Sequence, residues 1–265
     1  MSERPTRRPG ARPRTTIGLI GYGAFGRLAA SHLAPLFPIF AYDPACATDP
    51  APCRTVRGVT LCDAATAASC DLVILAMPAP RLSETIAAIR PHLRPGATVL
   101  DVCSVKVLPA EIMRAELPDH VDIIGTHPMF GPQSARGGIK GLKIVICPIR
   151  GSRARPLAAY MRKTFGLNAI LATPEEHDRE AAMVQGLTHL IAKVLVEMEP
   201  LPRNMTTASF DLLLRAVDMV RHDAPEVFYA IERMNPFAPE VRRRFFALAA
   251  DLAEELERNG GPAPE

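Results

Sequence analysis

The first two thirds of the chain combine two hydrophobic patterns. Short apolar runs rich in β-branched residues, bounded by glycine, proline or polar residues, are typical of buried strands. Such runs cover 15–21, 38–43, 70–78, 97–104, 121–128 and 142–148, with a further strand-like segment at 168–172. Residues 25–34 and 81–93 instead place apolar side chains three or four positions apart, which predicts helices.

The alternation of strands and helices indicates the fold class of this region. Parallel strands need crossover connections, and helices in those connections cover both faces of the sheet. We therefore expect an α/β fold, with a doubly wound, mostly parallel Rossmann sheet over residues 15–173.

After residue 173 the apolar spacing is helical throughout. Helices are predicted over 175–198, 207–222, 224–234 and 237–258. We expect residues 174–258 to form a smaller all-helical domain, with a loose C-terminus at 259–265. Long apolar helices in so small a unit are typical of a core that a second copy completes, so this is a predicted dimerisation domain of a homodimer. The alternative is a monomer whose helices pack on the sheet.

Composition is ordinary for a soluble globular protein, since 48% of the 265 residues are apolar and 22% are charged. Arginine and proline alternate over 1–14, which predicts a disordered basic tail without the apolar core of a signal peptide. No apolar run approaches the roughly 20 residues that span a bilayer. With a net charge of +3, we expect a cytoplasmic protein without a nucleic-acid or membrane partner.

Cysteine spacing argues against a metal centre. The six cysteines form no C-x-x-C pair and have no histidine at zinc-ligand spacing. We therefore expect reduced thiols and no metal site.

A glycine motif lies directly after the first predicted strand and before the first predicted helix. This G-x-G-x-x-G segment consists of Gly21, Tyr22, Gly23, Ala24, Phe25 and Gly26. The first glycine permits a tight turn, the second lets the backbone approach a pyrophosphate, and the third lets the helix pack on the strand. The motif predicts that residues 15–173 are a dinucleotide-binding domain.

Two further positions complete the predicted cofactor site. Asp43 ends the second strand, where a carboxylate accepts hydrogen bonds from a ribose 2′-hydroxyl and repels a 2′-phosphate, so NAD is favoured over NADP. The alternative is a turn residue before Pro44. Met77 and Pro78 end the third strand, where a nicotinamide would approach the sheet, although they are equally compatible with a simple strand terminator.

Candidate chemistry lies in the loops after successive strands, because open α/β sheets bind ligands at the carboxyl ends of their strands. His127 lies in Thr-His-Pro-Met-Phe-Gly-Pro, which predicts a turn-rich loop, and its imidazole can accept a proton near neutral pH. Ser104 can hydrogen-bond the imidazole or a substrate hydroxyl. Lys106 can pair with an anion or cap the next helix. We predict that His127 and Ser104 are the catalytic pair.

Taken together, GLIGYGAFG, DVCSVK, GTHPMFGP, EEHDREAAMVQGLTHLIAKVL and T-x-x-x-F-D-x-L-L resemble the prephenate/arogenate dehydrogenase family, and its plant-like arogenate branch above all. The resemblance runs from about 16 to 250. It implies a Rossmann domain, a helical dimerisation domain and oxidative decarboxylation of a cyclohexadienyl substrate in tyrosine biosynthesis. It also implies that His127 hydrogen-bonds the ring hydroxyl, with Ser104 beside it.

The chain departs from the family pattern at two positions. Gln133 stands where many relatives have an acidic residue after the histidine loop. By spacing from Pro225, Met219 stands where some prephenate-using relatives have an arginine that grips the substrate carboxylate. Arg215, one turn earlier, is either a substitute for that arginine or a solvated surface charge. These departures lean toward arogenate or mixed use.

Gln133, Gln185, His189 and Arg215 are therefore candidate substrate-binding residues beside Ser104 and His127. For His189 the alternative is a hydrogen-bonded core histidine. Two other functional classes stay open. One is a hydroxy-acid dehydrogenase or imine reductase, which would be expected to use a helical lysine such as Lys193. The other is a non-catalytic NAD-binding protein that keeps the fold.

Overall fold

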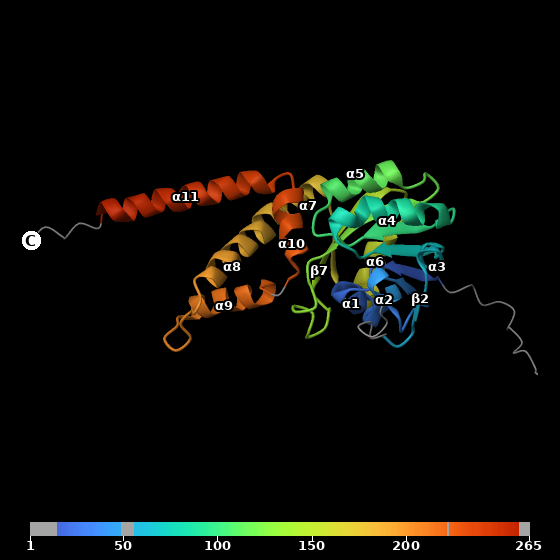
Figure 1. Ribbon diagram of the computed structural model, residues 1–265, viewed down its shortest axis with the longest axis horizontal. Helices are drawn as coiled ribbons and strands as arrows, with labels where there is room; N and C mark the ends of the chain where they lie inside the picture. Colours follow the sequence, from blue (N-terminus) through green and yellow to red (C-terminus); the bar gives the residue numbers. More distant parts are fainter. Residues whose placement is uncertain (1–14, 49–55, 222, 260–265) are drawn as a thin grey trace, which may run out of the picture.

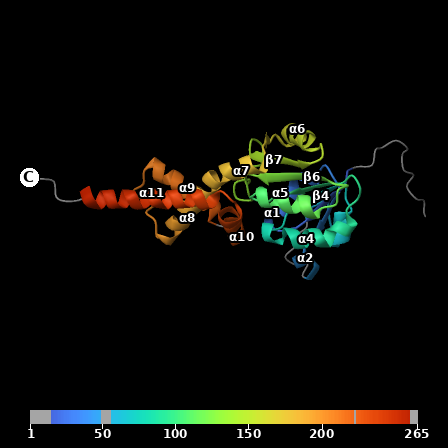
Figure 2. The same cartoon turned by 90° about the horizontal axis from the view of Figure 1, so that it is seen from above.

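The computed structural model describes residues 15–48, 56–221 and 223–259. The predicted basic tail, 1–14, and positions 260–265 of the predicted loose C-terminus lie outside the described residues. Two parts lie side by side in Figures 1 and 2: a sheet half, residues 15–173, and a helical half, residues 174–259.

The sheet half is built on one eight-stranded sheet with the order β3-β2-β1-β4-β5-β6-β7-β8. Its strands are β1 (Ile17–Ile20), β2 (Ile39–Tyr42), β3 (Val59–Leu61), β4 (Leu72–Leu75), β5 (Thr98–Asp101), β6 (Asp122–Pro128), β7 (Lys143–Arg150) and β8 (Asn168–Leu171). All neighbours are parallel except β6 and β7, which pair antiparallel. The expected doubly wound, mostly parallel sheet is confirmed.

Helices cover both faces of this sheet. They are α1 (Ala24–Leu33), α2 (Pro44–Thr48), α3 (Ala64–Ala68), α4 (Leu82–Ile89), α5 (Val107–Glu116) and α6 (Ala154–Phe165), with short 3₁₀ turns η1 (Ala79–Arg81) and η2 (Arg90–His92). Side chains of α1 and α6 join one hydrophobic core on one face, and those of α3, α4 and α5 join a second core on the other. The strands between them are buried on both faces, which explains their continuous apolar runs.

The helical half begins with a strong local signal at Thr173. The Thr173 hydroxyl accepts a hydrogen bond from Glu176 N, the Glu176 carboxylate accepts one from Thr173 N, and Pro174 occupies the first turn. The elements that follow are α7 (Pro174–Ala181), η3 (Ala182–Gly186), α8 (Leu187–Glu197), α9 (Ala208–Val220), α10 (Pro225–Tyr229), η4 (Ala230–Met234) and α11 (Ala238–Asn259). Both η3 and η4 are π-helical turns inside longer helices.

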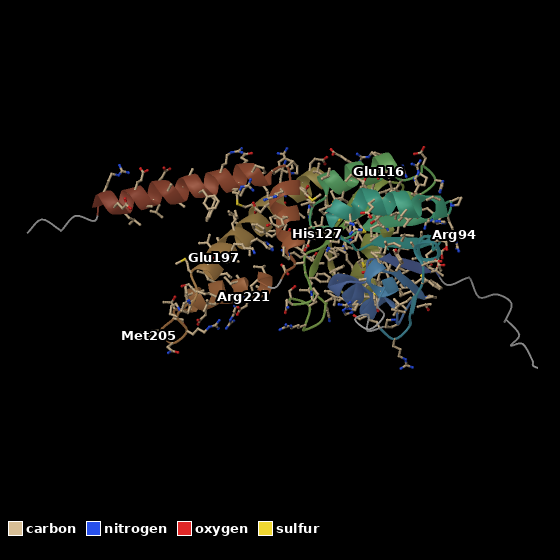
Figure 3. All side chains as sticks on the ribbon, in the orientation of Figure 1. Arg94, Glu116, His127, Glu197, Met205 and Arg221 are labelled. Carbon is tan, nitrogen blue, oxygen red and sulfur yellow. The ribbon has the colours of Figure 1, made fainter. Side chains whose placement is uncertain are left out.

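Many large apolar side chains of the helical half are exposed. They include Val194, Met198, Met205, Leu212, Leu213, Met219, Phe246, Leu248, Leu252 and Leu256. Helix α11 extends away from the sheet half in both views, and Figure 3 shows Met205 at the connection between α8 and α9, on the side away from the sheet. Among the described residues, no helix is both long enough and apolar enough to cross a membrane.

Candidate active site

The glycine loop between β1 and α1 has the backbone that its motif predicts. Gly21 has φ +99°, and its N–H donates to Tyr42 O at 2.8 Å. A Cβ on Gly21 would lie 2.5 Å from Ala76 O, and one on Gly26 would lie 2.2 Å from Gly21 O. A Cβ on Gly23 would meet no atom within 4 Å. Gly21 and Gly26 are therefore required by packing, whereas Gly23 borders open space.

The amino end of α1 fits a dinucleotide pyrophosphate. Gly23 is the N-cap residue, and no side chain caps this end of the helix. N–H groups of the first turn, which holds Ala24 and Phe25, therefore suit an anion. The Phe25 ring lies 6.5 Å from that of Phe130, which belongs to the segment after β6. The cofactor residues of the loop are thus brought next to the histidine segment.

Asp43 at the end of β2 is tied to the glycine loop. Its Oδ2 accepts a hydrogen bond from Tyr22 N at 2.7 Å, and its Oδ1 accepts one from Ala45 N at 2.9 Å. The Tyr22 side chain is buried, and its hydroxyl accepts from Val56 N at 2.9 Å. The bond from Ala45 N closes a turn at Asp43, as the alternative interpretation of this residue expects. Each carboxylate oxygen still has a further lone pair for a ribose hydroxyl.

Met77 and Pro78 follow β4, the strand that pairs with β1 on the side opposite β2. The strand order reverses at this pair, so the carboxyl ends of β1 and β4 border the crevice where such sheets bind ligands. Met77 is half-buried against the core, and Pro78 is exposed. The position suits a cofactor contact.

His127 lies in the strand that was predicted over 121–128, so the prediction of a turn-rich loop at this position is wrong. It belongs to β6 and stands opposite Val145 of β7. The antiparallel partner extends β6 to Pro128, because its hydrogen bonds continue past the point where the parallel strands end. The His127 side chain is 4% exposed, and it lies in a polar cluster at the junction of the two halves (Figure 3).

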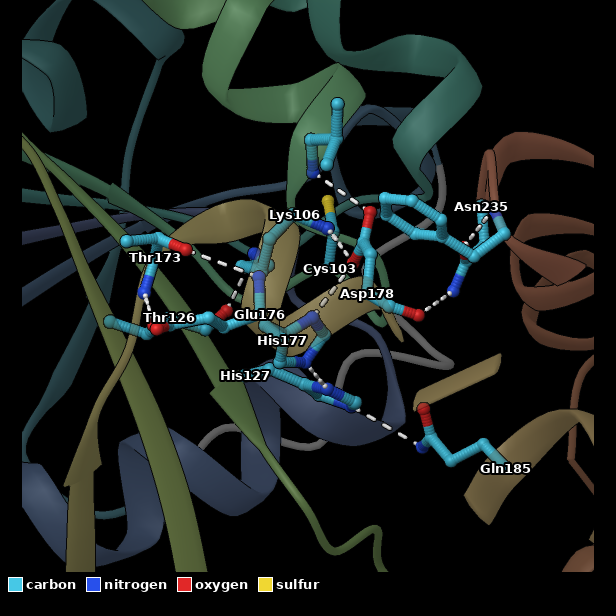
Figure 4. Close-up of polar contacts among 12 residues, drawn as sticks. Cys103, Lys106, Thr126, His127, Thr173, Glu176, His177, Asp178, Gln185 and Asn235 are labelled. Atoms are coloured by element: carbon cyan, nitrogen blue, oxygen red, sulfur yellow. Dashed lines mark hydrogen bonds and ion pairs between the residues drawn. The ribbon is translucent and has the colours of Figure 1, made fainter. Parts of the chain in front are cut away.

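A chain of hydrogen bonds runs behind His127 (Figure 4). His127 Nδ1 lies 2.8 Å from His177 Nε2, and His177 Nδ1 lies 2.7 Å from Asp178 Oδ1. The Asp178 carboxylate also accepts from Lys106 N at 2.7 Å and from Val107 N at 2.9 Å, at the amino end of α5. Helix α7 of the helical half therefore contacts two parts of the sheet half, His127 of β6 and the amino end of α5.

On its other side His127 faces Gln185 of the π-helical turn η3. Gln185 Nε2 lies 3.5 Å from His127 Nε2, and Gln185 Oε1 is buried without a hydrogen-bond partner. The predicted neighbours Gln185 and His127 are thus brought together. A buried amide oxygen without a partner is costly, which is typical of a group that awaits a ligand.

Lys106 is buried and pairs with an anion, one of the two roles expected for it. Its Nζ forms an ion pair with Asp101 Oδ2 and donates to Thr126 O at 2.7 Å. The Lys106 ammonium is therefore close to His127, because Thr126 precedes His127 in β6. Burial is the main cause that lowers the pKa of His127 well below 6.5, followed by His177 and Lys106. His127 is therefore a neutral imidazole, which can accept a proton.

Cysteine chemistry has no part in this cluster. Burial raises the pKa of the Cys103 thiol, and it raises that of Cys147 to about 12, so both stay protonated. Four of the described cysteines are free, as expected, but Cys46 is disulfide-bonded. The expectation of reduced thiols is therefore wrong at Cys46, because absence of a C-x-x-C spacing does not exclude other pairings. No metal-binding group of histidine, cysteine or carboxylate side chains occurs among the described residues.

Other predicted site residues are less engaged. Ser104 is half-buried after β5, and no hydrogen bond joins it to His127 among the described residues. Gln133 is half-buried in the segment after β6, and Arg215 is exposed on α9. Met219 is exposed on the same helix. The role of each stays a prediction.

His189 has the partners of a core histidine. Its Nδ1 lies 2.9 Å from Gln185 O and its Nε2 lies 3.3 Å from Asp223 Oδ2. Lys193, the lysine considered for a different dehydrogenase class, has its Nζ 5.4 Å from the centroid of the Phe228 ring. Both contacts belong to the packing of α8 and give neither residue a link to His127.

The sequence reasoning missed His177, Asp178 and Asn235 as site residues. Asn235 Nδ2 donates to Asp178 O at 2.7 Å, which ties the end of η4 to α7. The available signal was the adjacent histidine and aspartate on the first turns of a helix that begins immediately after the sheet. Such a pair sits where a second domain first meets the carboxyl edge of the strands.

Comparison with known proteins agrees with this geometry. Residues 48–162 match the family model described as prephenate dehydrogenase, nucleotide-binding domain. The chain is 26% identical to a probable arogenate/prephenate dehydrogenase of Methanocaldococcus jannaschii, over 69% of this chain and 43% of that protein. It is 26% identical to the chloroplastic arogenate dehydrogenase 1 of Arabidopsis thaliana, over 92% of this chain and 39% of that protein.

The chain thus spans less than half the length of these curated relatives. Among solved structures, prephenate dehydrogenase from Aquifex aeolicus, in complex with hydroxyphenyl propionate and NAD⁺, superposes with a TM-score of 0.71 at 20% identity. That match covers 96% of this chain and 94% of the other, and it shows a shared fold. By the family model and these relatives, the chain is similar to the prephenate/arogenate dehydrogenase family.

Proposed function

We propose that the chain catalyses the nicotinamide-dependent oxidative decarboxylation of prephenate, arogenate or both, in tyrosine biosynthesis. The observation that carries this proposal is the neutral His127, whose Nε2 faces Gln185, on a strand followed by Phe130, which lies against Phe25 of the cofactor loop. The relatives support the substrate class, because they are named as arogenate and prephenate dehydrogenases.

The cofactor would be held by the loop between β1 and α1 and by the ends of β2 and β4. These residues are Gly21, Tyr22, Gly23, Ala24, Phe25, Gly26, Asp43, Met77 and Pro78. The open space at Gly23 and the uncapped amino end of α1 support a pyrophosphate there. Asp43 favours NAD over NADP, because its carboxylate would repel a 2′-phosphate.

In the proposed reaction the substrate ring hydroxyl loses its proton to His127 Nε2, and its carboxylate leaves as carbon dioxide. When bound, the nicotinamide ring supplies the acceptor for the hydride from the carbinol carbon. Aromatisation of the ring makes the step favourable, so the protein's main tasks are orientation and exclusion of water. Ser104, Gln133, Gln185, His189 and Arg215 are the proposed residues around the substrate.

We also propose that the helical half, residues 174–258, forms a homodimer. Its exposed apolar side chains on α9 and α11 support a partner that covers them. A cytoplasmic location fits a biosynthetic enzyme of this kind, and it stays part of the proposal.

The test is an assay at the absorbance band of the reduced nicotinamide. Purified protein is mixed with NAD or NADP and with prephenate or arogenate, in all four combinations. We expect reduction with at least one substrate, more with NAD than with NADP, and more with arogenate because Met219 replaces the arginine of some prephenate-using relatives. No reduction in any combination would contradict the proposed function. Reduction with a small 2-hydroxy acid instead would support the other dehydrogenase class.

A further inference from the structure

The protonation pattern around His127 follows from the fixed hydrogen bonds of Asp178. Its carboxylate accepts three N–H donors: Lys106 N, Val107 N and the ring of His177. Two of these donors belong to the amino end of α5, where the helix dipole also favours a negative charge. Asp178 is therefore a carboxylate, and it requires a proton on His177 Nδ1.

This requirement sets the tautomer of each imidazole in turn. A neutral His177 that carries its proton on Nδ1 presents a lone pair at Nε2. That lone pair accepts from His127 Nδ1, 2.8 Å away, so the proton of the neutral His127 is on Nδ1. His127 Nε2 is then the free basic atom, and it points toward Gln185.

We propose that His177 and Asp178 form a proton relay behind His127, a proposal that rests on the proposed function. A substrate hydroxyl gives its proton to His127 Nε2, and His127 passes its Nδ1 proton to His177 Nε2. The positive charge then lies on His177, directly beside the Asp178 carboxylate, and His127 is neutral again. After the product has left, His127 releases the Nε2 proton to water and takes its Nδ1 proton back from His177, which restores both neutral imidazoles.

The surroundings of His127 give this relay a physical reason. His127 is buried and lies near the Lys106 ammonium, so a positive charge on its ring is unfavourable. His177 is as well buried, but its Nδ1 lies 2.7 Å from a carboxylate that no other side-chain cation contacts among the described residues. Transfer to His177 therefore moves the charge away from an ammonium and toward an anion.

The tautomers can be measured without any activity assay. In the full chain labelled with ¹⁵N-histidine, nitrogen–proton correlation spectra distinguish a protonated from an unprotonated ring nitrogen. We expect Nδ1 protonated and Nε2 unprotonated in both His127 and His177, with assignments from His127→Asn and His177→Gln. A protonated Nε2 on His127 would overturn the relay. This result does not depend on which substrate the enzyme uses.

Kinetics separate proton transfer from simple positioning. In His177→Gln the amide can accept from His127 Nδ1 and donate to Asp178, but it cannot carry a proton between them. We expect the single-turnover rate of His177→Gln to fall by about 10- to 100-fold, the usual scale for a partner behind a reacting histidine. The rate of His177→Leu should fall by the same factor. Substrate KM should change little, because His177 lies behind His127.

His120→Gln is the matched control, since His120 precedes β6 at its opposite end and contacts Leu93 O at 3.2 Å. It should keep the wild-type rate. A His177→Gln variant with wild-type turnover, while His177→Leu is slow, would show positioning alone and overturn the relay. Wild-type protein that is inactive with both substrates would instead contradict the proposed function. The measured tautomers of His127 and His177 would still test the hydrogen-bonded chain in that case.

Discussion

His127 combines burial with a polar setting, and this combination fixes its charge. Its ring is surrounded by His177 on α7, Lys106 before α5 and Gln185 on η3, with Asp178 one residue beyond His177. Two of these neighbours come from the helical half. A residue predicted from seven letters of sequence thus owes much of its chemistry to two side chains 50 and 58 positions away.

The lowered pKa of His127 has a consequence for stability. The folded pKa is lower than the unfolded value of about 6.5, so between the two values the unfolded chain binds a proton that the folded chain does not. The free energy of unfolding should therefore fall as the pH decreases below about 6.5, by at most about 1.4 kcal/mol per pH unit for this proton. Denaturant titrations of wild type and His127→Asn should show a smaller dependence in the variant, and identical slopes would refute the burial argument.

Asp43 carries the prediction on cofactor choice. Asp43→Ala removes the negative charge that would repel a 2′-phosphate, so the ratio of kcat/KM for NAD to that for NADP should decrease. The variant also removes the acceptor of Tyr22 N and Ala45 N, so thermal unfolding must be measured alongside. If the cofactor ratio is unchanged in a folded variant, Asp43 serves only the turn.

At the scale of elements, sequence periodicity predicted α1, α4, the helices after residue 173 and most strands, but it missed α5 and α6. Strands such as β4 and β5 are continuous apolar runs because both their faces are covered. The short elements were not predicted: α3 is Ala-Ala-Thr-Ala-Ala, which has no amphipathic pattern, and β3 has three residues. The strand predicted over 121–128 includes His127, but its antiparallel pairing with β7 is encoded by no local pattern.

In the candidate site, too, residues of a local sequence pattern were predicted, whereas residues that depend on distant contacts were not. Gly21, Gly23 and Gly26 follow from a local motif, because their spacing is visible in six consecutive residues even though Gly21 packs against the distant Ala76. His177 and Asp178 were missed because their importance comes from contacts across the junction, over 50 and 72 positions. Non-local contacts of this kind leave no periodic trace in a single sequence.

The glycine loop offers a matched pair of substitutions. In Gly26→Ala the new Cβ would lie 2.2 Å from Gly21 O, so helix and strand must separate. We expect a loss of about 1–3 kcal/mol in the free energy of unfolding. Gly23→Ala meets no atom within 4 Å and should keep the stability while weakening NAD binding, because its Cβ would lie where the pyrophosphate approaches. Thermal melts and NAD titrations check both, and the opposite pattern would contradict the assignment.

At the scale of the whole molecule, the two halves meet around the site. Asp178 of α7 accepts hydrogen bonds from the amino end of α5 and from Asn235 at the end of η4, so this one residue holds the three elements together. The helical half, in contrast, leaves apolar side chains of α11 exposed along its outer part. The site therefore belongs to one chain, while the outer helices suit a second copy.

This arrangement predicts an effect of charge on assembly. Leu252 and Leu256 are 55% and 65% exposed on α11. Leu252→Glu should shift sedimentation from dimer to monomer, because a carboxylate would be buried at the contact. Arg94→Glu, an exposed change on the sheet half, is the control. Wild-type protein that sediments as a monomer would refute the homodimer.

The most direct measurement compares His127→Asn with wild type for turnover and for NAD affinity. Asparagine can keep the hydrogen bond to His177 but has no basic atom at the position of Nε2. The account predicts a fall in kcat of about 100- to 10,000-fold, the scale of a positioned base, with NAD binding unchanged. Wild-type turnover in this variant would remove His127 from the chemistry and contradict the account.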